Sequence, residues 1–186
     1  MRRLLSLWMF ALAFVVLPSV AKADLKLAGR PRLARGETHE RQGISPRMGV
    51  RSGMSIVPNG FVPTIAVDWG FSGGITDRFT LGVQASLIGY LGLEAGGGAD
   101  IVAERFFGRG FYLHGALGAQ ANLPARAEDV QRAGVGGFGG LGYEFRIFKR
   151  MALALGVDYD ARVRTDGLYA QTVLMGVSFR GYLHKK

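Results

Sequence analysis

The chain has 186 residues, a formal net charge of +9 and no cysteine. The lack of cysteine excludes disulfide bonds, a thiolate metal site and a lipid-modified N-terminal cysteine. The basic residues are scattered and form no dense helix or stripe, so we expect no nucleic-acid partner. Glycine, with 29 residues, is more than twice as frequent as usual, without a collagen-like period.

The N-terminus has the three regions of a secretory signal peptide. Arg2 and Arg3 precede the largely apolar run Leu4–Val20, and Ala21-Lys22-Ala23 has the small residues of a cleavage site. We therefore expect residues 1–23 to be a signal peptide that is cleaved after Ala23. An uncleaved membrane anchor is the alternative, but the apolar run is short for a spanning helix.

The rest of the chain is expected to form one domain behind a short lead-in. Residues 24–43 lack periodicity and mix charges with proline and glycine, which predicts a flexible N-terminal segment. Residues 44–186 contain no further run of the about 20 apolar residues that a spanning helix needs. If this domain enters a membrane, it therefore does so as a β-barrel.

Apolar residues alternate with small or polar residues in eight successive stretches of this domain. Such alternation predicts β-strands whose two faces meet different surroundings, and about 9–11 residues suffice to cross a bilayer. Phe138 and Leu174 are apolar residues on the otherwise polar face. In chain order, the expected strands are Arg47–Val57, Phe61–Ser72, Phe79–Leu87, Leu93–Glu104, Phe111–Leu123, Val135–Ile147, Met151–Arg164 and Tyr169–Arg180.

Turn signals separate these stretches, and the sequence favours an all-β, eight-stranded antiparallel up-and-down transmembrane β-barrel. An even number of strands lets both termini lie on one side of a membrane. The longest polar connection, Pro124–Ala133, then lies on the external side and is expected to be a solvated loop, with contact to a partner as the alternative. Aromatic residues near strand ends, including Tyr90 and Phe106, suit interfacial girdles. A soluble, exported lipocalin-like barrel is the rival fold, because alternation alone does not say which face points inward.

Three segments carry a resemblance to known proteins: Gly74–Gln84, Gly137–Phe145 and the last expected strand around Val173–Phe179. With the strand pattern, they make the chain resemble the small eight-stranded outer-membrane β-barrel proteins, the OmpA-like transmembrane, OmpX-like and opacity-protein group. The resemblance implies a monomer in the outer membrane of the Gram-negative cell envelope, with outer-membrane lipids and the barrel-assembly machinery as partners. This chain departs from the family's aromatic C-terminal end, because Leu183–Lys186 follow the last aromatic residue.

The polar face carries nearly all charged residues of the expected strands, in similar numbers of each sign. An unpaired ion in a narrow interior costs several kcal/mol, and arginine bridges carboxylates well, so we expect a structural charge network. An ion-selective pore would instead present a ring of one sign. The expected interior network comprises Arg47, Arg51, Asp68, Asp100, Glu104, Glu144, Arg146, Asp158, Asp160, Arg162 and Arg180, with Glu94 and Arg164 on the same face. Closure of the barrel should place Arg47, Arg51 and Arg180 in one network with Asp68 and Asp158.

His114 is the one histidine within an expected strand, with Asp100 or Glu144 as expected partners. A nucleophilic triad would need a serine beside it, and no nucleophile-elbow motif supports Ser72, Ser86 or Ser178. The glycine-rich run Gly134–Gly140 lacks the helix of a phosphate loop and is interpreted as a strand. We expect no catalytic residue, no cofactor and no metal site.

The sequence thus favours an integral outer-membrane β-barrel protein with a structural or surface-interaction role. A narrow pore or small-solute transport protein is the main alternative, and a lipid-modifying outer-membrane enzyme is less favoured.

Overall fold

The structure is a computed structural model that describes residues 41, 43–57, 60–91, 94–107, 110–123, 133–148, 150–165 and 169–183. The expected signal peptide, residues 24–40 of the expected flexible segment and the loop residues 124–132 lie outside this range. In the described part, no helix is long and apolar enough to cross a membrane.

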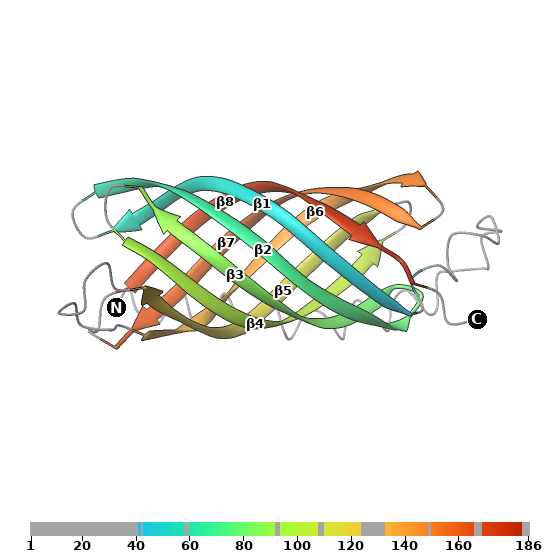
Figure 1. Ribbon diagram of the computed structural model, residues 1–186, viewed down its shortest axis with the longest axis horizontal. Helices are drawn as coiled ribbons and strands as arrows, with labels where there is room; N and C mark the ends of the chain where they lie inside the picture. Colours follow the sequence, from blue (N-terminus) through green and yellow to red (C-terminus); the bar gives the residue numbers. More distant parts are fainter. Residues whose placement is uncertain are drawn as a thin grey trace. The chain divides into compact units, whose positions relative to one another are not determined.

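The domain is a closed antiparallel β-barrel of eight strands in up-and-down order, as the sequence predicts (Figure 1). Each strand pairs with the next along the chain, and β1 pairs with β8 to close the sheet. The strands are β1 (Ile44–Val57), β2 (Gly60–Thr76), β3 (Phe79–Tyr90), β4 (Glu94–Phe107), β5 (Phe111–Leu123), β6 (Ala133–Phe148), β7 (Met151–Arg164) and β8 (Tyr169–Gly181). Several run a few residues beyond the expected bounds, because backbone pairing continues through glycine and polar residues such as Gly73 and Gly74.

The two ends of the barrel differ. β1 begins and β8 ends at the same end, which we call the termini end, and the opposite end is called the loop end. Short turns such as Asp77–Arg78 join strands at the termini end, whereas the longest connection, residues 124–132, leaves from the loop end. Gly110, in a termini-end turn, has a φ of 123°, a conformation that residues with a side chain rarely adopt.

The apolar face of the sheet points outward. Large side chains such as Met48, Ile101 and Met175 are exposed by 60, 62 and 63%. A water-soluble barrel of the lipocalin type would bury this face, so that interpretation of the alternation is wrong. An apolar exterior around a polar interior is the arrangement of transmembrane β-barrels.

The two apolar residues on the polar face fill the interior. Leu174 is 1% exposed and packs with Ala66 and Ile88, and Phe138 is 3% exposed and packs with Val102 and Ala116. They act as core residues because an eight-stranded barrel is just narrow enough for side chains to fill it.

The girdle prediction was wrong for Tyr90 and Phe106, which both point inward. Phe106 is 2% exposed and packs with Tyr112, and the Tyr90 hydroxyl accepts a hydrogen bond from Gln120. Both residues have even numbers, and the even-numbered residues of β3 and β4 point inward. The alternation along the strand therefore decides the direction of these side chains, even near a strand end. The described aromatic residues that point outward lie mainly toward the termini end: Phe71, Phe79, Phe107, Phe111, Tyr143, Phe145 and Phe179. Trp69 lies near the middle of β2, and Phe61 and Tyr159 lie toward the loop end.

Candidate functional site

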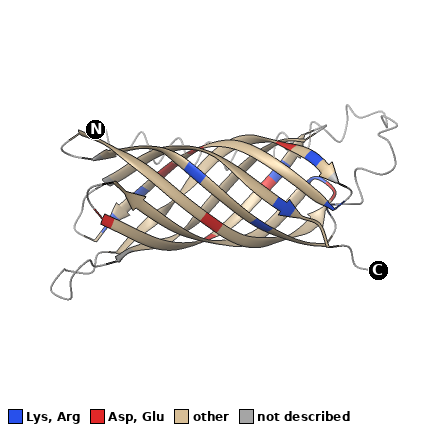
Figure 2. Cartoon of the chain, turned by 45° about the horizontal axis from the view of Figure 1, so that its top comes forward, with Lys and Arg blue, Asp and Glu red and all other residues tan. Residues whose placement is uncertain are grey.

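The interior of the barrel holds arginine and carboxylate side chains from six of the eight strands, all except β3 and β5. Figure 2 shows acidic and basic positions distributed along the strands. Each residue of the predicted interior network takes part in an ion pair there: Arg47, Arg51, Asp68, Asp100, Glu104, Glu144, Arg146, Asp158, Asp160, Arg162 and Arg180. The inward face of the sheet therefore brings charges of both signs together.

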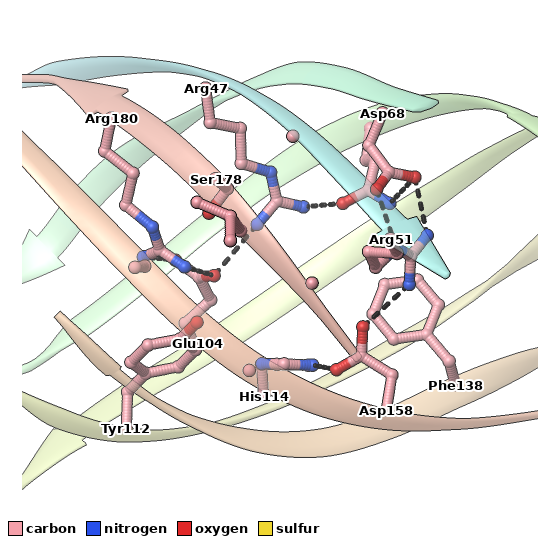
Figure 3. A pocket seen from close by; sticks show the side chains of 16 residues that line it. Arg47, Arg51, Asp68, Glu104, Tyr112, His114, Phe138, Asp158, Ser178 and Arg180 are labelled. Atoms are coloured by element: carbon pink, nitrogen blue, oxygen red, sulfur yellow. Dashed lines mark hydrogen bonds and ion pairs between the residues drawn. The ribbon is translucent and has the colours of Figure 1, made fainter. Parts of the chain in front are cut away.

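Arg51 is the centre of this arrangement. Its Nε and Nη2 donate to the two carboxylate oxygens of Asp68 at 2.6 and 2.5 Å, and its Nη1 donates to Asp158 at 2.7 Å (Figure 3). Gly176 lies opposite Arg51 on β8, and a Cβ atom there would collide with the arginine side chain. The glycine on β8 thus makes room for a guanidinium group that joins β2 to β7.

A second pair of arginines shares one carboxylate. Arg47 and Arg180 are register partners on β1 and β8, and Glu104 accepts from them at 2.8 and 3.0 Å. Arg47 also donates to Gln84, whose amide donates to Asp68 at 3.1 Å. Hydrogen bonds therefore run without a break from Glu104 to Asp68 and on to Arg51.

His114 joins the network through Asp158. Its Nε2 lies 2.6 Å from Asp158 on β7, so the expected partners Asp100 and Glu144 were wrong. His114, Gly140 and Asp158 lie opposite one another on β5, β6 and β7. A Cβ atom at Gly140 would come within 2.8 Å of the imidazole, so the glycine lets the two side chains meet above it.

No hydrogen bond within the described residues links His114 to a serine. Its ring instead lies 5.5 Å from that of Tyr112 and 5.6 Å from that of Phe138. Ser178 contributes to the same cavity wall from β8, close to Arg47 and Arg180 rather than to the histidine (Figure 3). A nucleophilic triad would need the serine, the imidazole and the acid in one hydrogen-bonded row.

Glu144 gathers partners at the termini end, two of which sequence reasoning missed. Arg41 donates to it at 3.3 Å, and the Tyr182 hydroxyl donates to its second oxygen. Burial raises the pKa of the Tyr182 hydroxyl, and the neighbouring carboxylate raises it further, so the group stays protonated as a donor. Arg41 lies in the segment without periodicity, and no signal in the sequence marked it.

A separate group of charges lies toward the loop end. Arg162 donates to Asp100 at 3.0 Å and to Asp160 at 3.0 Å, and Arg164 donates to Glu94 at 2.7 Å. The last pair is the more exposed, with about a quarter of each side chain accessible.

Two cavities lined by described interior residues are small. A cavity of about 50 Å³ lies among Arg51, His114 and Arg180, and another of about 30 Å³ lies near Tyr90 and Arg164 at the loop end. A buried water needs about 10–15 Å³ on this measure, so each cavity holds a few water molecules at most. The described residues contain no cluster of three or more histidine and acidic side chains fit to hold a metal ion.

No protein-family model and no curated protein sequence matches this chain. Solved structures do match its fold. Neisserial surface protein A (NspA) aligns with a TM-score of 0.56 at 10% identity, over 76% of this chain and 98% of that one. The N-terminal β-barrel domain of Pseudomonas aeruginosa OprF gives 0.52 at 14% identity, over 75% and 98%.

The attachment invasion locus protein Ail of Yersinia pestis gives a TM-score of 0.51 at 12% identity, over 75% of this chain and 99% of that one. These identities are too low to transfer a function, and they establish the fold. The chain has the fold of the small eight-stranded outer-membrane β-barrel proteins.

Proposed function

We propose that this chain is an integral outer-membrane protein with a structural or surface-interaction role and no catalytic activity. The observation that carries the proposal is the inverted distribution of side chains in a closed barrel. Apolar residues cover the outside, and paired charges fill the inside. Lipid favours an apolar outer face, and pairing of opposite charges lowers the free-energy cost of burying them in a narrow interior.

The connections support an orientation with the termini in the periplasm. Barrels of this class have short periplasmic turns and longer external loops. The two-residue turn Asp77–Arg78 lies at the termini end, and residues 124–132 leave from the loop end. We propose that the barrel-assembly machinery inserts the chain after cleavage at Ala23, that outer-membrane lipids surround it and that it remains a monomer.

The interior network favours a filled barrel over a pore. Opposite charges alternate along it, whereas a selective pore presents a ring of one sign. The ring of Phe138 lies against the guanidinium of Arg51, and the rings of Phe106 and Tyr112 lie against that of Arg180. We therefore assign the network a structural role, in which it holds the strands at fixed separations.

Two measurements test the proposal. Fractionation of cells that express the chain should recover it with outer membranes, and a protein found mainly in the soluble periplasm would contradict the location. Planar bilayers that contain the purified barrel should show no conductance above background. Stable single-channel steps would replace the structural role with that of a narrow pore.

A further inference from the structure

Arg105 breaks the apolar pattern of the outer face. Among the described strand positions that point outward, it is the one that carries a charge. It lies on β4 close to the termini end, opposite Phe79 on β3 and Leu113 on β5. Its guanidinium carbon is 5.4 Å from the centre of the Phe107 ring. Arg105 thus places a positive charge on a face of the sheet whose other described strand positions carry none.

A second arginine lies next to this site. Arg78 follows Asp77 in the turn between β2 and β3 and directly precedes Phe79. The carbonyl of Arg78 accepts a hydrogen bond from the backbone nitrogen of Phe106 at 2.8 Å, which ties the turn to the end of β4. With Asp77 counted, the local formal charge is still positive, which suits an anionic ligand.

The depth of the site matches that of lipid head groups. The outward aromatic residues of the barrel are concentrated at this end, and such residues sit at the level of the head groups. An outward arginine is strongly destabilising at the middle of a bilayer and is tolerated near its surface. In the proposed membrane orientation, Arg105, two residues before the end of β4, therefore lies at the level of the phosphate groups.

We propose that Arg105 and Arg78 bind the phosphate of an anionic glycerophospholipid in the leaflet at the termini end. Guanidinium groups bind phosphate through paired hydrogen bonds, and a second cation nearby strengthens the attraction. Phe79 and Leu113, the register partners of Arg105, flank the bound lipid. The inference rests on the proposed membrane location and adds a lipid class and a site to it.

Tryptophan fluorescence tests the proposal at the site itself. Trp69 is the one tryptophan after residue 23, so Trp69→Phe with Phe79→Trp moves the reporter beside Arg105. The mature chain is folded into vesicles that contain brominated phosphatidylglycerol or brominated phosphatidylcholine, and quenching gives the relative binding of the two lipids. We expect about a fivefold preference for phosphatidylglycerol, the contribution of about one basic residue near an anionic surface. Phe107→Trp supplies a second reporter if Phe79→Trp folds poorly.

Matched variants distinguish binding at Arg105 from a general attraction of anionic lipids to basic residues. Arg105→Gln should bring the preference close to one and Arg105→Lys should keep part of it, whereas Arg150→Gln, in another termini-end turn, should leave it unchanged. The original Trp69, about 20 Å from Arg105 along the strands, should report no preference. A preference that is absent, that survives Arg105→Gln or that Arg150→Gln abolishes equally would overturn the inference. Failure of every variant to fold into vesicles would instead refute the proposed function.

Discussion

Loss of the Arg51 guanidinium is expected to be the most damaging single change in the interior. Arg51→Ala removes the paired contact with Asp68 and the contact with Asp158. Breaking a buried ion pair from one side costs about 3–5 kcal/mol, less where water enters. Each carboxylate keeps one other contact, to Gln84 or His114, and a cavity of about 50 Å³ adjoins them. We therefore expect about 3 kcal/mol, at the lower end of the range.

The double-mutant cycle with Asp68 tests whether this energy belongs to the pair. Asp68→Ala leaves Arg51 its contact with Asp158, so its cost should be smaller, about 2 kcal/mol. The double variant should lose less than the sum of the single losses, by about 1–2 kcal/mol, the interaction energy of residues in contact. Urea titration of the barrel in phosphatidylcholine vesicles, followed by Trp69 fluorescence, measures these free energies of unfolding.

Glu94 provides the control for this cycle. It pairs with Arg164 toward the loop end, whereas Arg51 pairs with Asp68 and Asp158. The losses from Arg51→Ala and Glu94→Ala should add to within about 0.5 kcal/mol. If the losses from Arg51→Ala and Asp68→Ala also add, the network is refuted. If these variants in addition raise ion conductance sharply, the same charges line an open pore.

Three further changes probe the exterior, the packing and the termini end. Val157→Arg places a charge on the lipid-facing side near the middle of β7 and should lower the free energy of unfolding in vesicles by about 2–4 kcal/mol. Gly156→Ala, on the adjacent inward position, should lower it far less. Equal losses would contradict the assignment of the two faces. Gly140→Ala should lower the unfolding free energy by about 1–3 kcal/mol, because an added Cβ collides there with backbone and cavity-wall atoms. Gly139→Ala should change it very little, because an added Cβ there lies 3.8 Å from its nearest neighbour. A larger loss from Gly139→Ala would contradict the role of Gly140 in the contact between His114 and Asp158. Tyr182→Phe should lower the unfolding free energy by about 1–2 kcal/mol through loss of a donor to a buried carboxylate, and an unchanged midpoint would remove that hydrogen bond from the account.

The fold could be predicted from the sequence because lipid imposes a two-residue period on every strand. That period fixes which residues point inward once one face is known to be apolar and outward. It placed Asp68, Glu104 and Arg180 on the interior face without any knowledge of contacts. The misjudged positions of Tyr90 and Phe106 arose where nearness to a strand end was given more weight than the period.

The pairing within the interior could not be predicted from the period. Side chains from strands that are not neighbours meet across the lumen, and the partner of His114 depends on a glycine at position 140 that lets two side chains meet above β6. Arg41 contacts Glu144 from a stretch with no repeat at all, and only its three-dimensional position reveals the contact. Such contacts are set by the stagger of the closed barrel, which strand boundaries alone do not define.

The central claim, that the apolar face of this barrel meets lipid, has one direct measurement. The chain has no cysteine, so single cysteines introduced at each position from Leu153 to Asp158 on β7 can carry a fluorescent label without background. Quenching by lipids with a nitroxide on the acyl chain should be strong at positions 153, 155 and 157 and weak at 154, 156 and 158. Strong quenching at the even positions, or no alternation along β7, would contradict the account.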